Sequence, residues 1–330
     1  SWTFRKAPKF FDVVTYTGTG SARTIAHSLG SVPGMIVIKQ TNTSRDWQVY
    51  HRSLGTDNYI MLNRNNAEGP DNSGEYWNST TPTSTHFSLG DYFAVNQNGG
   101  TYIAYLFAHN DGDGGFNGGD IIKCGSYTGN GSNDGPEIDL GFEPQWLLIK
   151  DATSSSWNWM MVDAMRGCPV DGPEEILMAN TAGASQTPST ITSINLTPTG
   201  FKIADDYGAY NTNGNTYIYM AIRRGPLAAP TDAADVFDVN FASATATNPA
   251  VISTIPTIDM AILSSRTSAD KHYLASRLTG AYLRTDSTAV EGGQTSPAWK
   301  FDNQYGFYVT TGTLGTNYLA YMWKRAPSFF

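Results

Sequence analysis

Internal repetition constrains the fold of this chain more than any other feature of its sequence. The motif Tyr-Thr-Gly-x-Gly at residues 16–20 returns at residues 127–131, an offset of 111 (127 − 16). The same offset carries the Pro-then-apolar run at residues 33–39 onto residues 144–150. Because repetition at a fixed period is the signature of tandem structural units, the sequence predicts several copies of one small domain rather than a single large one.

The segment that closes each repeat occurs three times in the sequence. Residues 100–107 match residues 215–222, and a more diverged copy closes at residues 316–323. In that third copy, Phe-Ala-Ser-Ala-Thr from Phe241 stands where the others have Tyr-Thr-Gly-x-Gly. The predicted organisation is therefore the end of a preceding repeat or linker at 1–10, repeat 1 at 11–109, a Gly/Asp-rich linker at 110–120, repeat 2 at 121–224, a Pro/Ala-rich linker at 225–234, and a diverged repeat 3 at 235–330.

The two ends of the chain also share a pattern. Phe-Arg-Lys-Ala-Pro-Lys-Phe-Phe at residues 4–11 matches Trp-Lys-Arg-Ala-Pro-Ser-Phe-Phe at residues 323–330. One interpretation is that the chain is a single period excerpted from a longer array. The rival interpretation is a subunit whose two ends meet those of its neighbours in a filament.

Within a repeat, the local signals indicate strands. Residues 11–17 end in a Gly-rich turn, and residues 35–39 are β-branched and follow Pro-Gly. Residues 102–108 form a nearly continuous apolar run after a turn, which is typical of a strand covered on both faces. No window shows a sustained helical period. The prediction is an all-β chain of three tandem antiparallel β-sandwich domains, jelly-roll-like and about 100 residues each.

Charge narrows the range of partners. Lysine and arginine total 21 against 29 aspartate and glutamate, which gives a net charge of −8. Such a chain repels phosphate, so general binding to nucleic acid or to an anionic membrane surface is disfavoured. No apolar run reaches the ~18 residues of a membrane-spanning helix. We therefore expect neither a nucleic-acid partner nor membrane insertion.

The sequence offers no convincing catalytic site. His51 of repeat 1 is replaced by Asp163 in repeat 2, so the repeat carries no shared histidine. Neither Gly-x-Ser-x-Gly nor His-Glu-x-x-His occurs. The adjacent carboxylates at 174–175 and 205–206 would point to opposite faces of a strand rather than converge on a glycosidic bond. The prediction is a protein that is not an enzyme.

Two features leave alternatives open. Asp111, Asp113 and Asp120 offer oxygen ligands on a Gly-rich loop, as Ca²⁺ prefers, although the spacing is not that of an EF-hand. The alternative is a solvated linker without a cofactor. Cys124 and Cys168 are too few for a disulfide framework, and they form either one bridge or two buried thiols.

Aromatic residues in turn-rich segments are the remaining candidates for binding. A flat ring at a loop tip can stack on a sugar while neighbouring amides bond to its hydroxyls. Tyr207 and Tyr210 have no clear counterpart in the other repeats, which favours a ligand-binding role. Trp77 and Tyr305 are further candidates. Trp47 and Trp159, by contrast, occupy equivalent positions of two repeats and are expected to fill the same core slot.

Three sequence patterns carry a resemblance to a known family. They are Phe-Arg-Lys-Ala-Pro-x-Phe-Phe-Asp-Val-Val-Thr-Tyr-Thr-Gly from Phe4, Leu-Gly-Ser-Val-Pro-Gly-Met-Ile-Val-Ile-Lys from Leu29, and Asn-Gly-x-Thr-Tyr-Ile-Tyr-Met-Ala from Asn213. The chain resembles, over its whole length, a repeat of tail-fibre and other virion surface proteins of marine bacteriophages and cyanophages. The resemblance implies an extracellular virion appendage and transfers no catalytic or ligand residues.

The resulting hypothesis is a structural segment of a phage tail fibre that spaces a receptor-binding tip or contacts host surface glycans. Its expected partners are other virion proteins, host glycan and further copies of itself, fibres being commonly trimeric. The second hypothesis is a decoration protein or filament subunit that assembles through its matched ends. A polysaccharide depolymerase is the third, and it would require converging carboxylates.

Overall fold

The structure is a computed structural model that describes residues 2–71, 73–112, 119–168, 174–186, 193–225, 230–241, 251–255, 257–267, 272–277, 282–288, 299–303, 306–309 and 318–326. Strands dominate these residues, and in all three repeats the last strand pairs antiparallel with the first and the third. The prediction of an all-β antiparallel fold is confirmed. None of the described helices has the length and apolarity required to cross a membrane.

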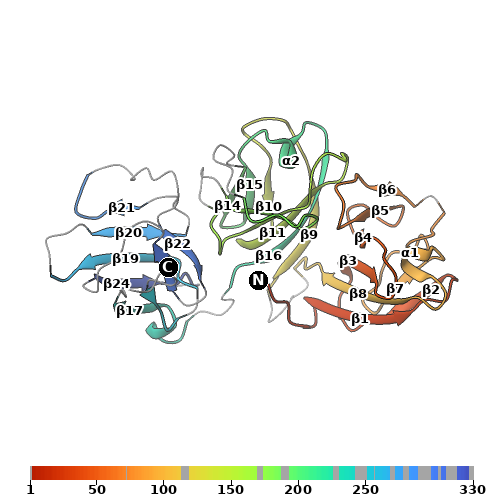
Figure 1. Ribbon diagram of the computed structural model, residues 1–330, viewed down its shortest axis with the longest axis horizontal. Helices are drawn as coiled ribbons and strands as arrows, with labels where there is room; N and C mark the ends of the chain where they lie inside the picture. Colours follow the sequence, from red (N-terminus) through yellow and green to blue (C-terminus); the bar gives the residue numbers. More distant parts are fainter. Residues whose placement is uncertain are drawn as a thin grey trace. The chain divides into compact units, whose positions relative to one another are not determined.

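Repeat 1 consists of a large sheet, a small sheet and one helical turn, α1 (Phe93–Asn96) (Figure 1). The large sheet has the order β1-β8-β3-β4-β5-β6, and the small sheet pairs β2 with β7. The strands are β1 (Phe11–Thr17), β2 (Arg23–Ala26), β3 (Pro33–Gln40), β4 (Gln48–His51), β5 (Asn58–Met61), β6 (Gly69–Pro70), β7 (His86–Leu89) and β8 (Thr101–Ala108).

Repeat 2 has the same plan, with α2 (Gly208–Asn211) as its helical turn. Its large sheet has the order β9-β16-β11-β12-β13 and its small sheet the order β10-β15-β14. The strands are β9 (Ile122–Thr128), β10 (Glu137–Asp139), β11 (Pro144–Asp151), β12 (Met160–Asp163), β13 (Ile176–Met178), β14 (Ile194–Thr197), β15 (Gly200–Ile203) and β16 (Thr216–Arg223).

Repeat 3 follows the same strand order once more. After the 3₁₀ turn η1 (Ala233–Asp235), the large sheet has the order β17-β24-β19-β20-β21 and the small sheet β18-β23-β22. The strands are β17 (Phe237–Phe241), β18 (Val251–Ile252), β19 (Met260–Ser265), β20 (Tyr273–Ser276), β21 (Leu283–Arg284), β22 (Trp299–Asn303), β23 (Gly306–Val309) and β24 (Tyr318–Trp323). In every repeat the first strand therefore pairs with the last, which pairs with the third.

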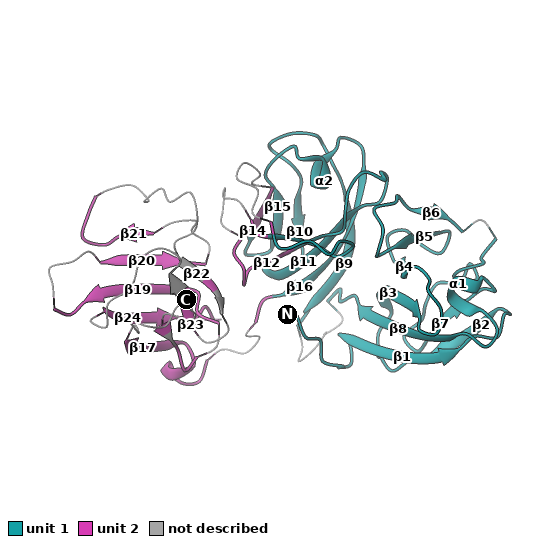
Figure 2. Cartoon of the chain, in the orientation of Figure 1, with its two compact units in different colours: residues 1–161, 176–185, 197–223 teal, residues 162–175, 186–196, 224–330 magenta. Residues whose placement is uncertain are grey.

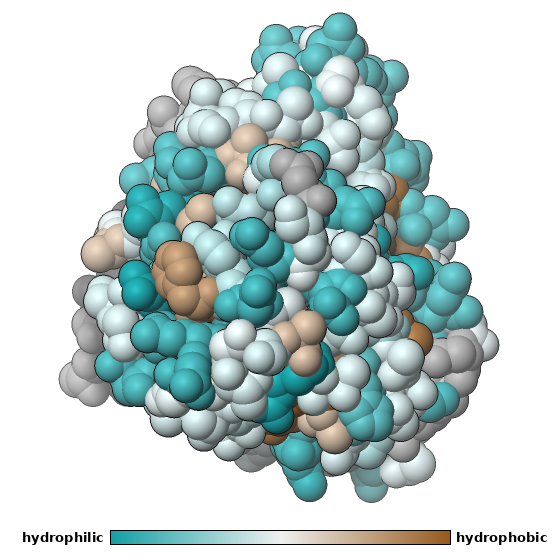
Figure 3. Space-filling model, turned by 90° about the vertical axis from the view of Figure 1, so that its right-hand side faces the viewer, coloured by the Kyte–Doolittle hydropathy of each residue, from teal (hydrophilic) through white to brown (hydrophobic). Residues whose placement is uncertain are grey.

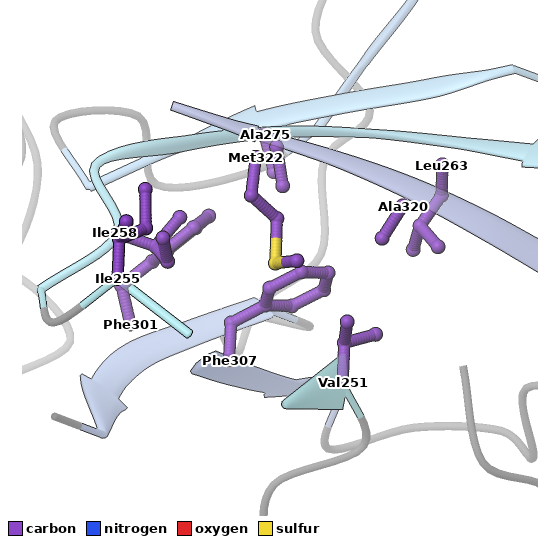
Figure 4. Packing of buried hydrophobic residues seen from close by; sticks show 10 residues of the cluster. Val251, Ile255, Ile258, Leu263, Ala275, Phe301, Phe307, Ala320 and Met322 are labelled. Atoms are coloured by element: carbon purple, nitrogen blue, oxygen red, sulfur yellow. The ribbon is translucent and has the colours of Figure 1, made fainter. Parts of the chain in front are cut away.

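Each core lies between the large and the small sheet. In repeat 3, one cluster joins Leu263, Ala320 and Met322 of the large sheet to Val251 and Phe307 of the small sheet (Figure 4). Residues alternate between the faces of a strand, so these side chains define an inner face. We call the opposite face of each large sheet its outer face.

Strand register corrects the sequence alignment of repeat 3 by one residue. Phe241 pairs with Leu319 of β24, as Thr15 pairs with Ile103 of β8. Phe241 therefore takes the place of Thr15 on the outer face and not that of Tyr16 on the inner face.

The chain divides into two compact units (Figure 2). Unit 1 comprises residues 1–161, 176–185 and 197–223, and unit 2 comprises residues 162–175, 186–196 and 224–330. Unit 1 thus holds repeat 1 together with most of repeat 2. Its two repeats are directly docked, because the Trp159 indole N–H donates to the carbonyl of Met61 (2.9 Å) and Glu68 N–H donates to the carbonyl of Ala152 (2.8 Å).

The segment that joins repeats 1 and 2 begins with a buried residue. Asn110 is fully buried, and its amide oxygen accepts from the N–H groups of Ile121 (3.0 Å) and Ile122 (3.2 Å). Its amide nitrogen donates to the carbonyl of Lys9 (3.0 Å). At least this end of the predicted linker is a fixed part of unit 1.

Unit 2 contains a buried ionic cluster. The Arg277 guanidinium, 5% exposed as a residue, donates to the Asp259 carboxylate at 3.1 Å and to the carbonyls of Met165 (2.8 Å) and Ala164 (3.2 Å). Arg224 pairs with the same carboxylate. Because a buried guanidinium is tolerated only when it is paired and hydrogen-bonded, this cluster fixes local geometry and leaves little room for a ligand.

Candidate functional site

The aromatic residues singled out from the sequence have different locations. Trp77 is buried and donates its indole N–H to the carbonyl of Asn58 (3.0 Å), and Tyr210 is fully buried in α2. A ligand could not stack on either ring without opening the core, so these two residues are corrected to core positions. Tyr207 lies half-buried just before α2 and remains a candidate. Tyr305 lies outside the described residues.

The proposed cation loop is only partly described, since Asp113 lies outside the described residues. Lys123 Nζ lies 3.6 Å from the Asp120 carboxylate and 3.9 Å from that of Asp111. The Gly112 N–H also donates to Asp120 (3.0 Å). In the described part of this loop the lysine ammonium supplies the positive charge that a cation would bring. No cluster of three or more metal-ligating side chains occurs among the described residues.

Both cysteines are buried free thiols rather than a bridge. Burial raises the pKa of Cys124 to about 12 and that of Cys168 well above its usual range. Neither thiol has the lowered pKa of a nucleophile or a metal ligand.

Tyr207 and Tyr210 do have counterparts in repeat 1, contrary to the sequence-based expectation. The Tyr127 hydroxyl donates to the carbonyl of Tyr210 (2.9 Å), just as the Tyr16 hydroxyl donates to that of Val95 (2.7 Å). Val95 is therefore the counterpart of Tyr210. By the same offset, Tyr92 before α1 is the counterpart of Tyr207 before α2.

Two buried tyrosines, one on the last strand of each repeat, hold the two helical turns in place through their hydroxyl groups. The Tyr102 hydroxyl donates to the carbonyl of Phe93 (2.7 Å) and accepts from Gln97 N–H (2.8 Å). In repeat 2, the Tyr217 hydroxyl donates to the carbonyl of Gly208 (2.7 Å) and accepts from Thr212 N–H (2.8 Å). Each phenol therefore binds both ends of one helical turn and links that turn to the last strand of its repeat.

A buried asparagine in each turn ties it to the neighbouring loops. The amide nitrogen of Asn96 donates to the carbonyls of Ser21 and Gly90, both at 2.7 Å. Asn211 donates in the same way to the carbonyls of Ser132 (2.8 Å) and Asp205 (3.0 Å). Because these buried amides are fully hydrogen-bonded, they hold the helical turns rigidly in place, and the turns can support the side chains that pack on their exposed side.

An aromatic or cationic side chain from the loop after the third strand covers each helical turn. In repeat 1, Arg45 lies 4.5 Å from the ring centroid of Phe93, which is 43% exposed. In repeat 2, the ring centroids of Trp157 and Tyr207 are 5.0 Å apart in an edge-to-face arrangement. We call these two places tip 1 (Arg45, Tyr92, Phe93) and tip 2 (Trp157, Tyr207, Gly208).

Glycine at position 208 leaves room for the Trp157 ring. A Cβ added to Gly208 would come within 2.6 Å of the Trp157 ring. The counterpart of Gly208 in tip 1 is Phe93, over which the slimmer Arg45 lies. In tip 1 the large aromatic ring, Phe93, belongs to the helical turn, whereas in tip 2 the large ring, Trp157, belongs to the loop. Each tip therefore presents an aromatic ring.

Lysines position the loops that carry Arg45 and Trp157. Lys39 Nζ donates to the carbonyl of Arg45, and Lys150 Nζ donates to the carbonyls of Asp151 (2.5 Å) and Ser154 (3.3 Å). Lys150 is fully buried, and burial lowers the pKa of its ammonium to about 8. Repeat 3 has Ser264 at this position, so it lacks the anchor.

Tip 1 continues into a row of phenol rings in contact with one another. The Tyr92 ring lies 4.3 Å from Phe93 and 4.5 Å from Tyr76, and Tyr76 lies 3.9 Å from Tyr59. Burial and its two tyrosine neighbours raise the pKa of Tyr76 far above the usual phenol range, so this ring stays neutral. The row ties tip 1 of repeat 1 to the buried ring of Tyr76, which is 6% exposed.

The chemistry available at the tips is stacking and hydrogen bonding. The exposed side chains of Asp91 and Gln97 flank tip 1, and Asp206 flanks tip 2. On the face drawn in Figure 3, hydrophilic residues dominate and apolar residues form small separate spots. Sequence reasoning found Tyr207 but missed Phe93 and Arg45. Extending the 115-residue offset of β8 and β16 back to the helical turns would have revealed them.

The fold and the tips define a class of protein: an all-β module of docked repeats with aromatic surfaces on rigid turns. The chain belongs to the family described as a domain of unknown function (DUF7483), which matches residues 6–226. No curated protein matches the chain, and no solved structure matches it.

The two limits of the family match fall on the same sequence pattern. The match begins within Phe-Arg-Lys-Ala-Pro at residues 4–8 and ends with Ile-Arg-Arg-Gly-Pro at residues 222–226. Both limits fall on the same apolar–basic–basic–small–Pro pattern, and the matched stretch contains repeats 1 and 2. The matched stretch of this chain therefore covers two repeats, and repeat 3 lies outside it.

Proposed function

We propose that this chain is a non-enzymatic structural segment of a phage tail fibre or a similar virion appendage. Docked repeats give a stiff spacer, because repeats 1 and 2 share buried contacts instead of being joined only by a flexible linker. The sequence patterns from Phe4, Leu29 and Asn213 support the virion assignment through their resemblance to virion surface proteins. The segment would then act outside the cell, in contact with other virion proteins.

We propose further that the tips contact host surface glycans. The observation that carries this proposal is that tip 1 and tip 2 occupy the same position of two repeats, each held on a rigid turn. An aromatic ring packs against the apolar face of a sugar, and flanking carboxylates and amides accept or donate bonds to its hydroxyls. Two weak sites on one stiff unit gain avidity on a repetitive polysaccharide.

The test is binding of the labelled full chain to candidate host cells and to their extracted envelope polysaccharides. We expect saturable binding to at least one strain, competed by its own polysaccharide. The double variants Trp157→Ala/Tyr207→Ala and Arg45→Ala/Phe93→Ala should each weaken it at least about tenfold. Val32→Ala is the matched control, because Val32 is 47% exposed and belongs to neither tip.

Absence of binding to every strain, or equal binding by the tip variants and the wild type, would refute the glycan proposal. Release of reducing ends from the polysaccharide would instead support the depolymerase hypothesis. The spacer proposal is tested separately, by locating the segment on virions with an antibody raised against the chain.

A further inference from the structure

The three outer faces can be compared position by position through strand register. Val13, Tyr105 and Val37 lie side by side on β1, β8 and β3. The corresponding row in repeat 2 is Cys124, Met220 and Leu148. In repeat 3 it is Val239, Tyr321 and Ile262. The rows differ mainly in how much solvent reaches them.

In repeat 2 the outer face is an interface. Cys124, Met220 and Leu148 are at most 4% exposed, although they face away from their own small sheet. Repeat 1 covers them: a Cβ on its Gly34 would come within 2.8 Å of Cys124. Trp146 on the same face contacts the Phe4 ring at a centroid distance of 6.1 Å.

In repeat 3 the outer face is open and apolar. Phe241 is 53% exposed and Val239 is 41% exposed, while Leu319, Tyr321 and Trp323 of β24 are partly exposed. Of nine described positions on β17, β24 and β19, eight are apolar or aromatic, and the ninth is Ser264. Contiguous apolar surface of this kind on a soluble protein marks a site of association.

The electrostatics of this face also favour a neutral, apolar partner. The acidic residue of β17, Asp238, belongs to the opposite face, where it accepts bonds from Thr254 N–H (2.7 Å) and the Ser253 hydroxyl (2.9 Å). The cation at the rim, Arg266, lies over the Phe241 ring at 5.0 Å. The nine strand positions of the face are all uncharged, so two copies of them could meet without opposing like charges.

We propose that the outer face of repeat 3 is a homodimer interface, occupied by the same face of a second copy of this chain. The corresponding face of repeat 2 is covered by another repeat of the same fold, which identifies a β-sandwich repeat as the kind of partner it fits. A self-complementary apolar patch closes into a twofold dimer. The inference goes beyond the proposed function and stands whether or not the tips bind glycan.

The experiment is sedimentation velocity of the full chain over about two orders of magnitude in concentration. We expect a monomer–dimer equilibrium without larger species. The double variant Val239→Asp/Phe241→Asp should raise the dimer dissociation constant at least about tenfold, because it would bury four carboxylates in the interface. Phe93→Asp is the matched control, because it places a carboxylate on a similarly exposed aromatic position of repeat 1 (43% against 53% for Phe241).

A second measurement needs no substitution. Carbene footprinting of the wild-type chain should label Val239 and Phe241 less at high than at low protein concentration, while labelling of Phe93 stays constant. A strictly monomeric chain, a dimer insensitive to Val239→Asp/Phe241→Asp, or open-ended growth of oligomers would each overturn the proposal. Open-ended growth would point instead to a head-to-tail filament.

Discussion

Trp47 and Trp159 occupy one position of the repeat and have the same backbone contacts, yet they differ in burial. The N–H of Trp47 donates to the Asn63 side chain (2.9 Å), and that of Trp159 donates to Asn180 (3.0 Å). Trp159 packs against repeat 1 and is 1% exposed, whereas Trp47 is only partly buried and lies under Lys39. The expected core slot exists for Trp159 and not for Trp47. The neighbouring repeat, more than the local fold, decides burial on this face.

Replacing each tryptophan by alanine should give the largest difference between the repeats. We expect Trp159→Ala to lower the free energy of unfolding by about 3–5 kcal/mol, because it leaves a cavity between the docked repeats and removes the indole hydrogen bond to the Met61 carbonyl. Trp47→Ala should cost about 1 kcal/mol. Denaturant unfolding of both variants measures the difference, and equal losses would mean that the repeats do not depend on this docking.

Acid should undock the repeats through His51. Its Nε2–H donates to the carbonyl of Tyr219 (3.1 Å), its Nδ1 accepts from Ser53 N–H, and burial lowers its pKa to about 4. The folded histidine stays neutral while the unfolded one takes up a proton near pH 6.5. The stabilisation is therefore complete above pH 6.5 and is lost as the pH falls towards 4, by up to about 3 kcal/mol.

The pH dependence of unfolding tests this expectation. His51→Gln can keep the donor to Tyr219 but does not titrate, so its stability should fall less steeply than that of the wild type between pH 6.5 and 4. Parallel curves for the two proteins would show that His51 does not control docking.

Gly34→Val should weaken docking by a smaller amount. A side chain there would meet Cys124 at 2.8 Å and the His109 Cβ at 2.9 Å, which costs about 1–3 kcal/mol through overpacking. Gln145 occupies the same position in repeat 2, so Gln145→Val should change stability by less than about 0.5 kcal/mol. Thermal unfolding of the pair measures this, and a neutral Gly34→Val would contradict the tight contact.

The smallest effect on stability should come from tip 2. Gly208→Ala pushes the Trp157 ring aside at a cost of about 1 kcal/mol, because the loop is exposed and can shift. Glycan binding by tip 2 should nevertheless fall, which separates the surface from the core. Unchanged binding in the polysaccharide assay would mean that the Trp157 position is not part of the site.

The repeat pattern was sufficient to predict the strands and the antiparallel class, but not which strands pair within a repeat. It was not sufficient for the binding surface. The offset between repeats changes from 111 at β1 to 115 at β8, so Tyr207 seemed to lack the counterpart that Tyr92 provides. Tyr210 and Trp77 were misplaced because turn-like composition does not reveal burial. The covered face of Cys124 depends on contact between repeats, which local sequence does not encode.

The two shielded sulfurs give the chain a pair of built-in chemical reporters. Cys124 lies against Gly34 at the junction of repeats 1 and 2, whereas Cys168 lies in unit 2, where its thiol donates to the carbonyl of Ile194 (3.2 Å). Both are fully buried, so a maleimide can react only after the surrounding structure opens. The alkylation rate of each sulfur therefore records a different opening event. Separation of the repeats can be timed in the wild-type protein, without introducing a new cysteine.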